Sequence, residues 1–87
     1  MENKRYTVLV TDKVRKIILK LSSNIASRIE KALLELEKDP RPSGCKKLKG
    51  RAAYRIRVGD YRIIYDIEDN ILRVIVIDLG HRRDIYR

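Results

Sequence analysis

The sequence is poor in the residues that make covalent cross-links and metal clusters. Its 87 residues include one cysteine, one histidine, no tryptophan and no phenylalanine. The single cysteine, Cys45, excludes an intramolecular disulfide and fits a reducing compartment. One histidine beside scattered carboxylates gives no metal-ligand spacing. We therefore expect a protein that uses neither a metal ion nor a cofactor.

Long hydrophobic runs are also missing. No apolar stretch approaches the roughly 20 residues of a membrane helix, and the first ten residues contain no signal-peptide core. The four glycines are scattered and form no phosphate-binding loop. A chain of this length predicts one small domain, residues 1–87, with a thin core. We expect it in the cytoplasm, without a membrane partner.

What the sequence has in excess is positive charge, with 21 basic and 12 acidic residues. Residues 41–65 hold eight of the basic residues and one of the acidic ones. Such a concentration attracts nucleic acid, an anionic membrane or an acidic protein. No basic amphipathic helix with bulky aromatics is present, so nucleic acid or an acidic protein is favoured over a membrane, and a merely solubilising surface is the alternative.

The first half of the chain alternates at the helical period. A short β-rich strand, 5–10, precedes two apolar stripes at i, i+3, i+4 and i+7 spacing, within 14–21 and 25–36. Serine and asparagine separate the stripes, and Asp39-Pro40 ends the second because a residue before proline disfavours the α region. This pattern predicts a two-helix hairpin.

The second half alternates at period two. After a loop over 40–50, strands are predicted over 54–58, 61–67 and 71–79, the last buried on both faces. The order β-α-α-β-β-β predicts a single α+β domain. The helix hairpin packs on one face of a mainly antiparallel four-stranded sheet, and the first strand pairs with the last or lies at an edge.

Three arginines are predicted on one face of this sheet. Arg55 and Arg57 point the same way because they are two residues apart in a strand, and Arg62 joins them from the hairpin partner. Like charges this close repel, so the arrangement favours an anionic ligand. The alternative is that each side chain reaches water at the rim of the sheet.

Arginines, one histidine and five tyrosines suit RNA cleavage without a metal. The 2′-hydroxyl of RNA attacks the adjacent phosphate when a protein aligns the groups, moves protons and stabilises negative charge. Guanidinium groups match phosphate oxygens, and tyrosines stack on bases. Catalytic triads and paired catalytic carboxylates are not indicated by any spacing.

The chain resembles the RelE/ParE toxin superfamily, and within it the RelE-type mRNA interferase branch. The resemblance spans nearly the whole chain and rests on LKG (48–50), YRIRVGDYRIIYDI (54–67) and GHRRDIYR (80–87). It implies the toxin of a type II toxin–antitoxin system, a metal-independent endoribonuclease that cuts mRNA in the ribosomal A site. It also implies a RelB-like antitoxin that holds the toxin inactive.

The resemblance assigns roles by position. Arg62, in GDYR, and Arg82, in GHR, are expected to bind the scissile phosphate. Tyr86, in DIY, is expected to stack on or orient a base, or to assist proton transfer. The two basic positions before the hairpin fall on Arg55 and Arg57, where well-studied members carry lysine.

That departure affects proton transfer. Arginine does not lose its proton in proteins, so Arg55 and Arg57 supply charge and are poor acids or bases. His81 is a candidate for that role, because histidine titrates near neutral pH; a surface position is its alternative, and Tyr86 is the other candidate.

Further basic residues are expected to contact ribosomal RNA or acidic antitoxin residues, namely Lys46, Lys47, Lys49, Arg51 and Arg83. Two other functions stay open at this point. One is a ParE-like DNA gyrase poison without nuclease activity, and the other is a domain with no activity of its own.

Overall fold

The computed structural model describes residues 5–50 and 52–81. Its elements are, in chain order, β1 (Thr7–Val10), α1 (Asp12–Lys20), α2 (Ser23–Lys38), β2 (Lys46–Lys47), β3 (Tyr54–Val58), β4 (Tyr61–Glu68), the 3₁₀ turn η1 (Asp69–Ile71) and β5 (Arg73–His81). The predicted α+β order is confirmed, with one strand more than expected.

Hydroxyl side chains begin both helices. Thr11 accepts a hydrogen bond from the Val14 amide at 3.3 Å, and Ser22 accepts one from the Ile25 amide at 3.4 Å. Each cap satisfies a backbone donor that has no partner within its own helix. These caps fix where the chain turns from strand to helix, and then from the first helix to the second.

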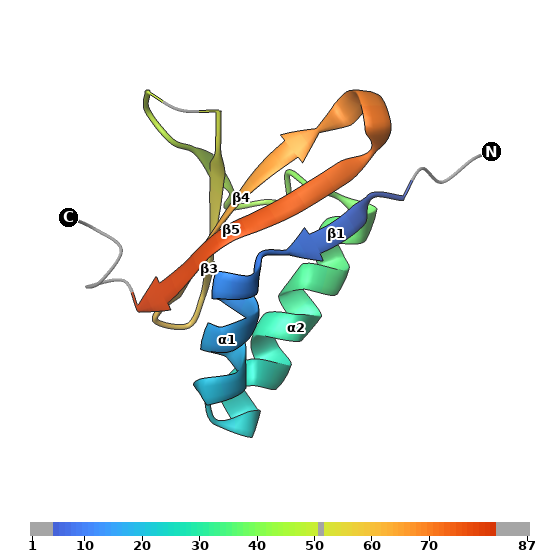
Figure 1. Ribbon diagram of the computed structural model, residues 1–87. Helices are drawn as coiled ribbons and strands as arrows, with labels where there is room; N and C mark the ends of the chain where they lie inside the picture. The colour runs from blue at the N-terminus through green and yellow to red at the C-terminus, as the bar shows by residue number, and fades with distance from the viewer. Residues whose placement is uncertain (1–4, 51, 82–87) are drawn as a thin grey trace.

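The sheet has the strand order β1-β5-β4-β3-β2. β1 pairs with β5 in parallel, and the other three pairings are antiparallel. In Figure 1 both helices lie side by side on the same side of the sheet. The first strand therefore both lies at an edge and pairs with the last strand.

The core lies between the helices and this face of the sheet. Its buried side chains come from every layer, and the largest are Val14, Ile29, Leu36, Ile63, Tyr65, Val74 and Val76. The apolar stripes predicted on the helices supply the first three. The opposite face of the sheet, which carries the arginines, has no helix against it in the described part of the chain (Figure 1).

Two predictions about strands were wrong. The segment 40–50 is not all loop, because Lys46 and Lys47 pair with Arg55 and Tyr54 as a fifth strand. The last strand is not buried on both faces either, since its burial largely alternates and it runs on to His81. A register shift falls where Ile64 and Tyr65 pair with Asp78 and Val76, so one extra residue of β5 bulges out.

A polar cluster joins three segments that are far apart in the sequence, at residues 6, 41 and 69. Asp69 accepts two hydrogen bonds from the Arg41 guanidinium, at 2.9 and 3.2 Å, and one from the Tyr6 hydroxyl at 2.7 Å. These bonds lower the pKa of Asp69 to about 2 and raise the pKa of Tyr6. Arg41 also lies over the Tyr54 ring, 5.1 Å from its centroid.

Candidate functional site

The β3–β4 hairpin brings three arginines to one face of the sheet. Arg57 lies directly opposite Arg62, and Arg55 lies opposite Ile64. Because residues paired across strands share a face, all three side chains start from the face of the sheet away from the helices. The face predicted from the sequence is therefore present, and we call Arg55, Arg57 and Arg62 the arginine face.

The arginine face is partly desolvated. Arg62 is 4% exposed and Arg55 is 8% exposed, whereas Arg57 is an exposed residue. The alternative in which every arginine reaches water at a rim therefore fails for two of the three. A buried guanidinium keeps its charge, and this costs free energy unless other groups compensate for the lost water. The fold thus holds two permanent positive charges in surroundings that strengthen their interaction with an anion.

Lysines extend this face toward the edge of the sheet. Lys46 of β2 pairs with Arg55 and so lies on the same face, while Lys47 pairs with Tyr54 and lies on the other. Both lysines and Lys49, in the following turn, are exposed. The predicted ribosome-contacting lysines therefore surround the hairpin without all sharing the arginine face.

His81 lies on the opposite face from the arginines. It pairs with Tyr61, and its ring meets the Tyr61 ring edge to face with 5.6 Å between centroids. The neighbouring pair along the strands is Arg62 with Gly80, and successive residues in a strand point to opposite faces. The structure therefore separates His81 from the three arginines with which the sequence grouped it.

The remaining predicted site residues lie outside the described residues. These are Arg51, Arg82, Arg83 and Tyr86. The roles assigned to them stay predictions. Within residues 5–50 and 52–81, no group of three or more histidine, cysteine, aspartate or glutamate side chains is arranged to hold a metal ion, and no helix is long and apolar enough to cross a membrane.

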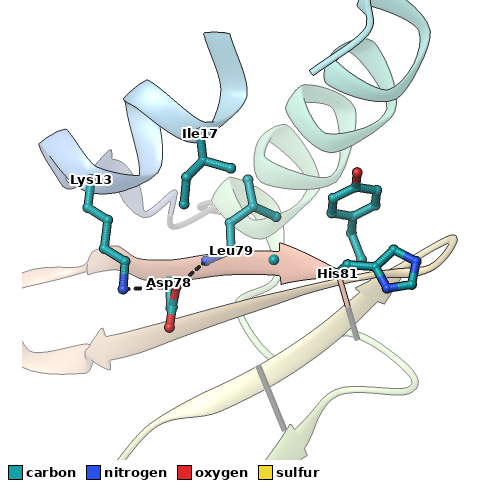
Figure 2. A pocket seen from close by; sticks show the side chains of 7 residues that line it. Lys13, Ile17, Asp78, Leu79 and His81 are labelled. Carbon is teal, nitrogen blue, oxygen red and sulfur yellow. Dashed lines mark hydrogen bonds and ion pairs between the residues drawn. The ribbon is translucent and has the colours of Figure 1, made fainter. Parts of the chain in front are cut away.

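Sequence reasoning missed the groups that line a cavity between α1 and the last residues of β5. Lys13 of α1 pairs with Asp78 of β5 at 3.3 Å, and Ile17 lies near Leu79 (Figure 2). Arg28 of α2 lies against the Gly59 turn. These contacts join residues more than 30 positions apart, so no local spacing in the sequence indicates them.

Comparisons with known proteins agree with this geometry. Residues 5–86 match the model of a family described as the ParE toxin of type II toxin–antitoxin system, parDE. Toxin RelG of Mycobacterium tuberculosis (strain ATCC 25618 / H37Rv) is 36% identical over 85 residues, which cover 94% of this chain and 97% of RelG.

Solved structures give the same result. RelE in the archaeal RelE–RelB complex from Pyrococcus horikoshii OT3 superposes with a TM-score of 0.82 and 28% identity, covering 90% of this chain and 96% of that one. The isolated E. coli RelE toxin gives a TM-score of 0.76 and 29% identity, covering 87% and 83%. The chain therefore belongs to the RelE/ParE superfamily of toxins from type II toxin–antitoxin systems.

Proposed function

We propose that this toxin is a ribosome-dependent endoribonuclease, an mRNA interferase that cuts mRNA in the ribosomal A site. The observation that carries the proposal is the arginine face, in which Arg55 and Arg62 are nearly buried and Arg57 stands opposite Arg62. Positive charges held close together with little water around them suit a phosphate ligand. A phosphate in its transition state gains most from such charges.

The proposed reaction needs only the RNA and the protein. The 2′-oxygen of one nucleotide attacks the adjacent phosphorus, forming a new oxygen–phosphorus bond while the bond to the 5′-oxygen breaks. The 2′-hydroxyl loses its proton and the departing 5′-oxygen gains one, so the products are a 2′,3′-cyclic phosphate and a 5′-hydroxyl. Extra negative charge develops on the phosphate oxygens between these states, and guanidinium groups stabilise it.

We propose roles from the placement of each described residue and, for Arg82 and Tyr86, from the family resemblance. Arg62 and Arg57 would face the scissile phosphate, with Arg82 joining them as the family resemblance implies. Arg55 would add charge, since arginine does not release a proton. Because His81 points to the other face, we assign orientation of the base and assistance of proton transfer to Tyr86.

Binding to the ribosome would use the exposed cations around the hairpin. Lys46, Lys47 and Lys49 are exposed in the structure, and Arg51 and Arg83 complete the proposed set. Contacts of this kind with an RNA backbone are independent of sequence and weaken with salt. A toxin that acts on translating ribosomes works in the cytoplasm.

The partner that restrains the toxin would be a RelB-like antitoxin. The relatives from Pyrococcus horikoshii and E. coli form RelE–RelB and RelBE complexes. The present chain has a formal charge of +9, which favours an acidic partner that covers cationic surface.

A second candidate function is poisoning of DNA gyrase, favoured by the match to a family model that carries the ParE name. That activity needs no phosphate-cleaving face. It predicts loss of supercoiling by purified gyrase in the presence of toxin, with ribosome-bound mRNA left intact.

A reconstituted translation complex tests the two functions against each other. Ribosomes stalled with a defined codon in the A site are mixed with purified toxin, and primer extension locates new mRNA ends. The proposal predicts cuts within that codon and none in the same mRNA without ribosomes. Intact mRNA together with inhibited gyrase would establish the second candidate instead.

A further inference from the structure

Three cavities that share lining residues follow the helices past the β3–β4 turn. One cavity of about 350 Å³ lies between α2 and the β3–β4 turn, lined by Arg28, Gly59, Asp60, Tyr61 and His81 among others. It shares Tyr61 and His81 with a cavity of about 380 Å³ at Lys13 and Asp78, which Figure 2 shows. We call the first cavity, between α2 and the β3–β4 turn, the helix-side groove.

An aromatic pair stands where the two cavities meet. Tyr61 and His81 come from adjacent strands, and their rings touch edge to face at 5.6 Å. Both are half-buried, so each retains some ring surface that solvent reaches. A ring held in place by its strand and by a neighbouring ring suits stacking on a nucleobase, because little side-chain freedom is lost on binding.

A guanidinium group lies beside this pair. The terminal atoms of Arg28 lie 3.3 and 3.4 Å from where a β-carbon of Gly59 would be, so the guanidinium lies close against the turn that this glycine forms. Arg28 is exposed, and its donors are available to a phosphate at the mouth of the groove.

Further charges continue from Arg28 along α2. A cavity of about 460 Å³ shares Arg28, Val58 and Gly59 with the groove and adds Lys31 and Arg57. This second cavity contains one carboxylate, Glu35, and the helix-side groove contains another, Asp60. Asp78, at the other end, is already paired with Lys13. Across these two cavities the cations Arg28, Lys31 and Arg57 outnumber the carboxylates Glu35 and Asp60. A carboxylate accepts hydrogen bonds from base amino groups.

We infer that the helix-side groove binds a nucleotide of single-stranded RNA, with its base stacked on the Tyr61 ring beside His81 and its phosphate on Arg28. A cationic groove with aromatic stacking surfaces is the general solution for single strands. Arg57 lines the continuing cavity and belongs to the arginine face, so one strand of RNA would reach both sites at the end of the sheet. The inference rests on the proposed function in that it names where substrate RNA lies beyond the cut.

RNA binding without cleavage tests the inference. The probe is a fluorescein-labelled hexauridylate with 2′-O-methyl groups, which the 2′-hydroxyl mechanism cannot cut, and its anisotropy is measured with the full-length toxin at several KCl concentrations. Arg28→Gln is compared with Lys38→Gln, which removes one exposed charge from the same helix outside the groove. Tyr61→Leu is compared with Tyr61→Phe, which keeps a ring.

We expect Arg28→Gln to weaken binding and to reduce the slope of log affinity against log salt by about 0.7, the value for one phosphate contact on a single strand. Lys38→Gln should leave that slope unchanged. Tyr61→Leu should weaken binding about fivefold or more at unchanged slope, as loss of one stacked base implies. Tyr61→Phe should stay within about twofold of the parent protein.

Three results would overturn the inference. They are no binding by the parent toxin, equal slopes for Arg28→Gln and Lys38→Gln, and equal affinities for Tyr61→Leu and Tyr61→Phe. If Tyr61→Leu does not fold, the comparison of Arg28→Gln with Lys38→Gln decides alone, because both residues are exposed. A toxin that shows these binding effects but leaves ribosome-bound mRNA intact would contradict the proposed function and support RNA binding in the groove. A toxin that cuts ribosome-bound mRNA but shows none of these binding effects would support the proposed function and contradict RNA binding in the groove.

Discussion

Arg57 of β3 lies directly opposite Arg62 of β4, so two positive charges face each other across the hairpin. Opposite positions in an antiparallel pair bring the β-carbons to about 5 Å, where like charges repel. The hairpin therefore concentrates positive charge on one face, where a phosphate ligand adds favourable attraction.

Removing the exposed member of this pair should separate activity from stability. Arg57→Gln is expected to leave the melting temperature unchanged or slightly raised, because repulsion is relieved. It should lower the rate of mRNA cleavage on ribosomes by about tenfold or more, since a charge near the phosphate is lost. Thermal unfolding followed by circular dichroism and single-turnover cleavage measure the two effects.

Lys16→Gln is a matched control, since Lys16 is an exposed cation on α1 far from the hairpin in sequence. It should cut at the parent rate. A fully active Arg57→Gln with a lowered melting temperature would mean that the pair has a structural role and does not face the substrate.

Tyr65 anchors the loop after α2 to the core. Its hydroxyl donates to the carbonyl oxygen of Pro40 at 2.8 Å, and burial followed by the neighbouring Cys45 raises the pKa of this phenol. Tyr65→Phe keeps the ring but leaves the carbonyl without this donor, so we expect a loss of about 1–2 kcal/mol in the free energy of unfolding. Urea denaturation checks this, and an unchanged midpoint would contradict it.

The cluster at Asp69 predicts a dependence of stability on pH. Hydrogen bonds from Arg41 and Tyr6 lower the pKa of Asp69 from 3.8 to about 2, so its contribution is complete above pH 4 and disappears as the pH falls through 2. Asp69→Asn should therefore be less stable than the parent at pH 7, and the two should converge near pH 2. A difference that persists undiminished at pH 2 would exclude this ionisation as its cause.

Gly59 has an unusual backbone conformation and a close neighbour. Its φ of +59° favours glycine, and an added β-carbon would lie 3.3 Å from the Arg28 guanidinium. Gly59→Ala should cost about 1 kcal/mol of stability and displace Arg28. Ala26→Gly, a helix substitution of similar cost, gives a control for stability alone. Equal RNA affinity for both variants would show that the position of Arg28 is unimportant.

Much of the fold was predictable because its signals are local. The helical stripes identified both helices, and the period-two pattern identified the two strands of the β3–β4 hairpin. The period-two pattern placed Arg55, Arg57 and Arg62 on one face. Each of these features depends on residues within a few positions of one another.

What escaped prediction depends on distant pairing. Lys46 and Lys47 form a strand only because β3 pairs with them, and two residues carry no period of their own. The side on which His81 lies follows from its partner Tyr61, 20 positions away, and from a bulge concealed in a continuous apolar run. The groove beside Arg28 needs α2 to lie against the turn, which no spacing in the sequence encodes.

Mapping new mRNA ends after a short pulse of toxin expression in cells tests directly whether this toxin cuts mRNA on the ribosome. Such cleavage predicts new ends at codons within translated regions, which are lost in the Arg62→Gln and Tyr86→Ala variants. Intact mRNA in cells whose DNA loses supercoiling would contradict it.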